Sequence, residues 1–309
     1  MQPPTFDPGL TQQFTAPLRR AINKDGSFNV RRRGTTWRDT HPYLYLINAR
    51  WSVFLGLMFA GYLVVNTLFA LVYYSLGPNE LQGADASTAL DHFLNSFFFS
   101  AHTLTTVGYG SISPKGVEAN IVAAFEAMVG LMGFALATGL LFGRFSRPSA
   151  RIGFSTNVLI APYQDASSLQ FRIVNLRANT LTELEARVML MTVEGPPGQL
   201  ARKYMPLRLE RPSVYFLPLT WTIVHPINSH SPLHGLAATD LERLQAELLI
   251  LIKGFDDTFS QTVNARYSYR YDEFVWSARF APAFQIDAAG DMVLDVDRVG
   301  AFRGEEAPA

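Results

Sequence analysis

The sequence has no cysteine among its 309 residues, which excludes disulfides and thiolate metal sites. Charged residues are also scarce, at 17%, where a soluble domain carries about a quarter. The 26 basic residues equal the 26 acidic ones, and a formal net charge of zero argues against a nucleic-acid partner. The chain has neither a phosphate-binding glycine-rich loop nor a nucleophile elbow, so we do not expect an enzyme.

The missing charges are concentrated in two apolar segments. Residues 51–77 contain no charged side chain, and residues 120–143 contain only Glu126. At about 1.5 Å per residue, each segment exceeds the roughly 30 Å hydrocarbon core of a bilayer as a helix. We therefore predict transmembrane helices at residues 51–76 and 120–143.

Basic residues predict how these segments are oriented. The stretch between them, residues 78–119, holds a single basic residue, Lys115, whereas basic residues are frequent on the outer sides of both segments. The positive-inside rule then places both chain termini in the cytoplasm. These flanking residues are Arg19, Arg20, Lys24, Arg31, Arg32, Arg33, Arg38, Arg50, Arg144, Arg147 and Arg151.

Between the two segments lies a motif that suits a potassium-selective filter: Thr106, Val107, Gly108, Tyr109 and Gly110. TVGYG loops replace the hydration shell of K⁺ with backbone carbonyl oxygens. Gly108 and Gly110 permit the positive φ angles that such a backbone needs, where a Cβ would clash. One chain supplies a single row of carbonyls, so the site requires a symmetric assembly, most simply a ring of four in which the chain joins three identical subunits. We expect no cofactor, and K⁺ at the filter as the only metal.

The segments around the motif complete a pore domain at residues 49–147. Residues 88–104 are too short to span a bilayer and suit a re-entrant pore helix ending at the filter. The second transmembrane segment carries Gly130 and Gly139. Small residues in membrane helices permit close helix approach, and the alternative is a hinge for gating.

The rest of the chain divides into four parts. Residues 1–34 lack an apolar period and predict a mostly extended or disordered arm. Residues 35–48 suit an interfacial helix if Pro42 falls in its first turn. Residues 148–300 alternate short apolar or alternating runs, among them residues 247–255 and 273–280, with turn signals, which indicates a β-sandwich, and residues 301–309 form a tail. Within the sandwich, Thr239 and Glu242 form a capping-box pattern that predicts a short helix at residues 239–246.

Several motifs together resemble the prokaryotic inward-rectifier potassium channels, the KirBac family. The resemblance runs from about Trp37 to Val296 and includes segments of the predicted β domain as well as the filter. The matching segments are Trp37-Arg38-Asp39, Thr103 to Gly110, Arg144 to Pro148, Trp221 to Ile227, Ser231 to Gly235, Gln261 to Tyr269 and Glu273 to Trp276.

The resemblance implies a homotetramer with two membrane helices per subunit and an immunoglobulin-like β domain in the cytoplasm. It implies that the protein lies in a bacterial inner membrane as a multi-pass protein. Phe142 falls where the family places a bulky apolar gate residue, and Gly130 and Gly139 fall on proposed bending points. Phe134 aligns with the cavity position that is acidic in strong eukaryotic rectifiers, so strong block from the cavity is not expected.

The sequence departs from the family at the filter's surroundings. His102 stands where many members have Glu or Gln, and Ile112 aligns with the arginine that pairs with that glutamate in eukaryotic members. That ion pair cannot form here. Many members carry an aspartate at Ser111, so this pore mouth should attract cations less.

Other polar residues leave alternatives open. Glu126 either concentrates cations in the pore or braces the back of the filter, because intramembrane carboxylates are functional candidates. His225, His230 and His234 lie close in sequence, but without Cys, Asp or Glu neighbours they favour a structural loop over a zinc site.

Three arginines near the predicted membrane plane, Arg38, Arg147 and Arg151, either signal orientation only or bind anionic lipid headgroups. The leading hypothesis from the sequence is a passive potassium-selective channel gated on its cytoplasmic side. The alternatives are a weakly selective cation channel, and a non-conducting membrane-anchored sensor.

Overall fold

The computed structural model describes residues 9–10, 13–14, 20–31, 33–34, 41–146, 150–164, 166–196 and 199–304. The chain forms two compact units. One contains residues 33–147, and the other combines residues 1–32 with residues 148–309. We call them the pore unit and the β unit and describe each separately.

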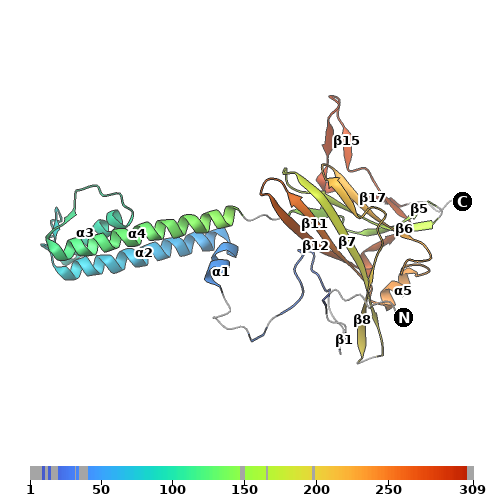
Figure 1. Ribbon diagram of the computed structural model, residues 1–309, viewed down its shortest axis with the longest axis horizontal. Coiled ribbons are helices and arrows are strands. Elements are labelled where there is room, and N and C mark those ends of the chain that lie inside the picture. Colours follow the sequence, from blue (N-terminus) through green and yellow to red (C-terminus); the bar gives the residue numbers. More distant parts are fainter. Residues whose placement is uncertain are drawn as a thin grey trace. The chain divides into compact units, whose positions relative to one another are not determined.

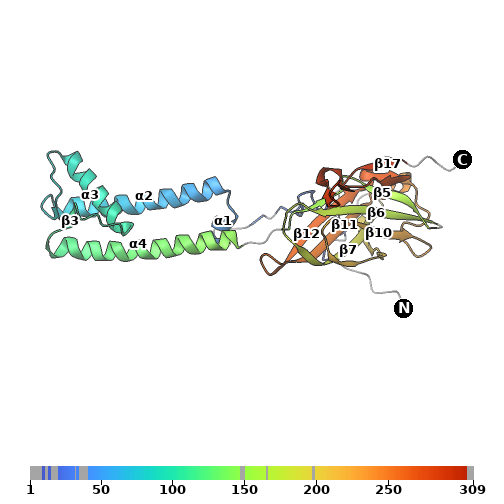
Figure 2. The same cartoon turned by 90° about the horizontal axis from the view of Figure 1, so that it is seen from above.

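The pore unit is built on two long helices, α2 (Trp51–Leu76) and α4 (Gly116–Phe145). Figure 2 shows them running alongside each other, with α3 (Ala89–Leu104) at one end and α1 (Pro42–Asn48) at the other. Both long helices are long and apolar enough to cross a membrane. The observed α2 has the predicted bounds, whereas α4 begins four residues before and ends two residues after the predicted 120–143.

The two shorter helices begin at residues that favour a helix start. Thr88 caps α3: its hydroxyl accepts the Asp91 backbone N–H at 3.1 Å, and the Asp91 carboxylate accepts the Thr88 N–H at 3.0 Å. Pro42 is the first residue of α1, where its missing N–H costs nothing. The predicted beginning of the interfacial helix, residues 35–40, lies outside the described residues.

The β unit packs two sheets against each other. The larger sheet has the order β1-β8-β7-β11-β12 with β9 also on β7, and the smaller has the order β10-β6-β5-β13 with β4 on β6. All pairs within these sheets are antiparallel except β13 on β5. The strands are β1 (Gln13–Phe14), β4 (Ile152–Phe154), β5 (Val158–Tyr163), β6 (Ala166–Asn175), β7 (Leu181–Glu194), β8 (Leu200–Pro206), β9 (Ser213–Phe216), β10 (Thr220–Ile227), β11 (Glu247–Asp256), β12 (Gln261–Arg270) and β13 (Phe274–Trp276).

The core of the β unit lies between these two sheets. It follows from period-two alternation: β10 buries Trp221, Ile223 and Ile227 against the facing sheet and leaves the residues between them partly exposed, except His225. β7 and β11 pair closely and contribute Leu184, Leu190, Leu248 and Ile250 to the same core. Burial of this continuous apolar layer accounts for a domain that holds its own fold.

Short pairs of strands complete the two units. β14 (Ala278–Phe280) pairs with β17 (Phe302–Gly304), so the β unit extends past the predicted boundary at residue 300. β15 (Phe284–Ile286) and β16 (Met292–Leu294) form a hairpin that projects from the sheets in Figure 1. In the pore unit, β2 (Leu81–Gln82) pairs with β3 (Ser113–Pro114).

The short helix of the β unit does not use the predicted capping box. Helix α5 spans Ala238–Arg243, and Asp240 is the residue whose carboxylate accepts the backbone N–H of Ala237 at 3.0 Å. The prediction of a box at Thr239 and Glu242 was therefore wrong. The helix starts one residue earlier, and Asp240 performs the role assigned to Glu242.

The described residues of the N-terminal arm are more ordered than their composition predicts. Strand β1 pairs with β8, and residues 20–31 pack on the β unit, with Ile22 only 5% exposed. The lack of an apolar period did not indicate this order, because one buried isoleucine and a set of polar contacts hold residues 20–31.

Candidate ion-conduction site

The TVGYG motif forms a loop directly after α3. Three of its residues have positive φ: Gly108 at 54°, Gly110 at 78° and Thr106 at 60°. Both glycines therefore adopt the backbone region that a Cβ disfavours. Thr106 was not expected there, because a β-branched residue is strained at positive φ.

Hydrogen bonds from the filter back to the pore helix hold this loop. The backbone N–H groups of Val107 and Gly108 both donate to the carbonyl oxygen of His102, at 2.9 and 3.3 Å. Two successive amides on one acceptor fix the turn in which Thr106 sits, which explains how its backbone conformation is maintained.

The ring of His102 also packs against the filter. Its centroid lies 4.8 Å from that of Tyr109, edge to face. Ile112 packs beside the apolar cluster of Tyr73, Leu81 and Phe99. The positions that form an ion pair in eukaryotic relatives therefore contribute an aromatic contact and an apolar contact here.

Glu126 lies behind the pore helix and is fully buried within the single chain. The Tyr73 hydroxyl of α2 donates to one carboxylate oxygen at 2.8 Å, and the Ser100 hydroxyl of α3 contacts the other. Ser100 Oγ also lies 2.6 Å from the side-chain oxygen of Asn66. Four buried polar side chains thus join all three helices behind the TVGYG loop, where the low dielectric of the interior strengthens the hydrogen bonds among them.

The two glycines considered as hinges have different surroundings. A Cβ at Gly130 would lie 2.1 Å from the carbonyl oxygen of Leu104, the last residue of α3. Gly130 is therefore needed for close packing at the filter's base. At Gly139 a Cβ would meet nothing within 4 Å, and α4 is continuous through both positions.

The two phenylalanines singled out on α4 lie on the surface of the single chain. Phe134 and Phe142 are each 72% exposed. Large apolar side chains in this state require lipid, another subunit or a pore around them. The single chain leaves them available for any of these.

Arg144 has a structural role that its sequence context did not reveal. Its guanidinium donates to the carbonyl oxygens of Leu46, Ile47 and Ala49, and the last two bonds measure 3.0 and 2.8 Å. It also lies 4.5 Å from the ring centroid of Trp51. A cation at the C-terminal end of α1 satisfies its free carbonyls, so Arg144 fastens α1 to the end of α4.

Only one of the three arginines proposed to touch lipid is among the described residues. Arg38 and Arg147 lie outside the described residues. Arg151 is exposed at the start of the β unit, where its carbonyl accepts the Leu176 N–H at 2.9 Å. The structure therefore gives no contact among these three.

The histidines do not converge on a metal site. His225 is buried, with its ring nitrogens 2.6 Å from the Arg208 carbonyl oxygen and 2.8 Å from Ser231 Oγ, while His230 and His234 are exposed. Burial lowers the pKa of His225, which favours the neutral ring. Among the residues that the structure describes, no group of three or more metal-ligating side chains gathers.

Comparisons with known proteins agree with this architecture. Residues 152–307 match the family model described as the inward rectifier potassium channel C-terminal domain, and residues 61–147 match the model described as an ion channel. The two matches correspond closely to the β unit and the pore unit.

Three similar proteins are each named as inward rectifier potassium channels. The inward rectifier potassium channel Kirbac3.1 of Paramagnetospirillum magnetotacticum is 35% identical over 94% of this chain and 98% of its own length. The ATP-sensitive inward rectifier potassium channel 12 of Gallus gallus is 28% identical over 85% of this chain and 67% of its own. The human G protein-activated inward rectifier potassium channel 3 is 26% identical over 98% of this chain and 82% of its own.

The chain belongs to the inward rectifier potassium channel family and is of the prokaryotic KirBac type. It is a membrane ion channel with two transmembrane helices and a C-terminal β-rich domain, and it is not an enzyme. K⁺ is accordingly the permeant ion rather than a cofactor.

Proposed function

We propose that the chain forms a homotetrameric, potassium-selective pore in which residues 106–110 of each subunit supply one row of ligands. The observation that supports this most is the filter loop itself, with positive φ at Gly108 and Gly110 and two amides anchored on His102. A single chain cannot surround an ion with such a loop, so four-fold symmetry follows from the chemistry of K⁺ coordination.

We propose that Glu126 braces the filter rather than lining the pore. Its full burial inside one subunit and its bonds to Tyr73 and Ser100 favour this role over cation concentration. Together with the His102–Tyr109 contact, this network takes the place of the ion pair lost at His102 and Ile112.

The proposed location follows from the family, and the proposed orientation follows from charge. The proposal places the protein in a bacterial inner membrane with both termini and the β unit in the cytoplasm, as the positive-inside rule favours. We propose Phe142 as an apolar gate near the cytoplasmic end of α4 and Gly139, whose surroundings are open, as the bending point. Phe134 would then face the cavity.

Anionic lipid headgroups are the proposed modulators, held by Arg38, Arg147 and Arg151 in the tetramer. Replacing Arg147 and Arg151 with Gln should weaken the response of flux to anionic lipid by about 1 kcal/mol per residue. Arg303→Gln, also exposed in the β unit, is the matched control. A lipid titration equal to wild type in the double variant would reduce these arginines to orientation signals.

Ion flux in liposomes tests the proposed function. Purified protein should carry K⁺ and Rb⁺, and Gly108→Ala should abolish that flux because it forces a Cβ onto a backbone at φ 54°. Tetramer content measured on the same preparation separates loss of conduction from loss of assembly. Selective flux at the wild-type level in intact Gly108→Ala tetramers would remove the filter assignment.

A further inference from the structure

A polar cavity lies at one end of the larger sheet, where β7, β8, β11 and β12 come close to helix α5. Its volume is about 210 Å³, and its lining includes three arginines, Arg20, Arg202 and Arg270. Arg20 precedes the first strand of the sandwich by more than a hundred residues, whereas Arg202 lies on β8 and Arg270 on β12, so only the folded β unit brings them together. Positive side chains that converge on one cavity favour an anion there.

The pairing register of the strands explains why Arg202 and Arg270 reach the same cavity. Glu247 on β11 lies opposite Met191 on β7 and opposite Arg270 on β12. Two residues further along β7, Val193 lies opposite Arg202 on β8. Alternate residues of a strand share a face, and residues paired across strands share it too, so both arginines project from the same face of the sheet.

The carboxylates of the cavity do not balance its arginines. Two carboxylates, those of Glu242 and Glu247, line the cavity together with the three arginines. Glu247 is only 3% exposed, and each of its oxygens accepts the backbone N–H of Ala21 at 3.0 Å, so a backbone donor already shares its charge. Glu242 is exposed on α5, where solvent screens it. The cavity therefore keeps an excess of positive charge.

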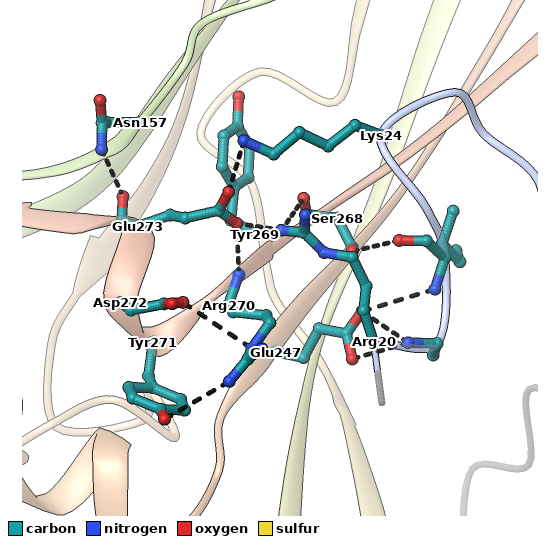
Figure 3. A network of polar contacts seen from close by, with 12 residues as sticks. Arg20, Lys24, Asn157, Glu247, Ser268, Tyr269, Arg270, Tyr271, Asp272 and Glu273 are labelled. Atoms are coloured by element: carbon teal, nitrogen blue, oxygen red, sulfur yellow. Dashed lines mark hydrogen bonds and ion pairs between the residues drawn. The ribbon is translucent and has the colours of Figure 1, made fainter. Parts of the chain in front are cut away.

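Arg270 is held only by long contacts of its side chain. Its Nε lies 3.7 Å from the exposed carboxylate of Asp272, and a terminal nitrogen lies 3.4 Å from the Tyr271 hydroxyl (Figure 3). Contacts of this length contribute little stability. The side chain is 43% exposed, so a ligand can reach its guanidinium.

Arg20 brings a buried donor to the same cavity. One of its terminal nitrogens donates to the Ser268 carbonyl at 3.0 Å and contacts the Glu273 carboxylate (Figure 3). Its Nε is buried and has no hydrogen-bond partner among the described residues. A buried N–H without an acceptor costs free energy, and an oxyanion in the cavity would supply the acceptor.

We propose that this cavity is a binding site for a small oxyanion of the phosphate type, with Arg202 and Arg270 as its main ligands. The planar guanidinium fork matches two oxygens of a phosphate group. A cavity of this size accommodates one or two phosphate groups but not a nucleotide, since drug-sized ligands occupy pockets of about 300 Å³ or more. The site is independent of the proposed channel function, because all its lining residues belong to the β unit.

Calorimetric titration of the full-length protein in detergent tests the site, with pyrophosphate as the probe in phosphate-free buffer at constant ionic strength. Arg202→Gln and Arg270→Gln each remove one guanidinium, and Arg270→Lys keeps the charge but loses the planar fork. The matched control is Arg187→Gln, which removes an exposed arginine of β7 that does not line the cavity.

We expect wild type to bind pyrophosphate saturably, and the Kd to rise about tenfold or more in both Gln variants and by a smaller factor in Arg270→Lys. The control should match wild type. Absence of saturable binding to wild type would overturn the site. Equal affinities in wild type, the Gln variants and the control would mean an adventitious ion only.

Hydrogen exchange of wild type provides a test that does not depend on a variant folding. The Tyr271 N–H donates to the Ala246 carbonyl at 2.9 Å, so residues 244–247 and 270–272 form one connected rim of the cavity. Pyrophosphate should slow exchange at these residues, and unchanged exchange would overturn the proposal. Phosphate groups also occur on lipids, so the second arm uses nanodiscs of phosphatidylcholine and phosphatidic acid without free anion. We expect no protection there, and protection by the lipid alone would overturn the assignment to a free anion.

Discussion

Glu126 shows how a single charged residue can be accommodated within the membrane part of this chain. Its carboxylate is removed from solvent but bonded to hydroxyls from two other helices. An unpaired carboxylate at this depth would be costly, so the network holds the three helices in one arrangement. Because α3 ends at the filter, that arrangement also fixes where the filter loop begins.

Tyr73→Phe should weaken this network. It removes one donor from a buried carboxylate, with an expected cost of about 1–3 kcal/mol per subunit. We expect a lower melting temperature of the tetramer and a reduced preference for K⁺ over Na⁺. Tyr62→Phe on the same helix is the control, and the two variants should differ in both measurements. Equal behaviour would mean that Glu126 does not brace the filter.

At the residue scale, the sequence singled out individual residues more readily than the residues that they contact. The proposed filter could be singled out because its five residues are contiguous and their backbone chemistry is specific. Glu126 could be singled out as the only acid in the spans, but its partner Tyr73 lies 53 positions away. Arg144 was interpreted as an orientation signal, because nothing local shows that the carbonyls of α1 lie beside it.

Helix α4 contains two glycines for which we considered two roles, close packing and bending. Gly130 and Gly139 look alike in the sequence, yet only Gly130 has a backbone carbonyl where its Cβ would be. Close helix approach and bending can therefore belong to different glycines of the same helix. The structure favours packing at Gly130 and leaves Gly139 for bending.

Alanine at each glycine separates the two roles. Gly130→Ala places a Cβ 2.1 Å from the Leu104 carbonyl oxygen, so the helices must move apart, and we expect loss of stable tetramer or of selective flux. Gly139→Ala meets no neighbour and should assemble normally. If Gly139 is the bending point, flux per tetramer should fall in that variant. A stable, fully selective Gly130→Ala channel would refute the packing argument.

Among the elements, long uniform segments were predicted well and interrupted ones were not. The bounds of α2 follow from a charge-free run, and β11 follows from an apolar run of strand length. The run at residues 273–280 looks like one strand, but Ser277 has a φ of 50° and divides it into β13 and β14, which belong to different sheets. A single backbone reversal of this kind leaves little trace in hydrophobicity.

Residues 20–31 pack on the β unit through ion pairs of Arg20 and Lys24 with Glu273, and this docking should respond to acid in a narrow range. Because the pKa of Glu273 is lowered in the folded state, its ion pairs are complete above the ordinary value of about 4.3 and are lost as pH falls through the lowered one. The absence of cysteine allows a single spin label at Val30→Cys, a position that is 68% exposed.

We expect the label's mobility to be constant from pH 8 to pH 5 and to rise only below about pH 4. Adding Glu273→Gln should raise mobility already at pH 7. A rise that occurs between pH 8 and pH 5 would show that another group controls the docking.

At the scale of the whole molecule, the single chain is incomplete as a channel. The filter loop and the α4 phenylalanines are exposed in it, with Tyr109 at 74% and Phe142 at 72%. Both observations are accounted for by a ring of four subunits in which these residues surround one axis. In the proposed tetramer, the filter selects ions and the other end of α4 gates them.

Phe142→Ser tests that division of roles. Four phenyl rings at one level would block hydrated K⁺ by dewetting, so a hydroxyl there should raise resting flux without changing the preference for K⁺ over Na⁺. Phe145→Ser, at a 66% exposed position that packs on Trp51, is the comparison. Flux per tetramer that stays at the wild-type value would show that Phe142 packs or faces lipid instead.

The central claim is that residues 106–110 select potassium in a tetrameric pore. The most direct test is the reversal potential of purified wild-type protein in a planar bilayer, with mostly K⁺ on one side and mostly Na⁺ with a small known K⁺ concentration on the other. A potassium-selective pore would give a current that reverses close to the potassium equilibrium potential. A reversal near zero would indicate a weakly selective cation channel, and the absence of current from intact tetramers under all tested lipids would contradict conduction itself.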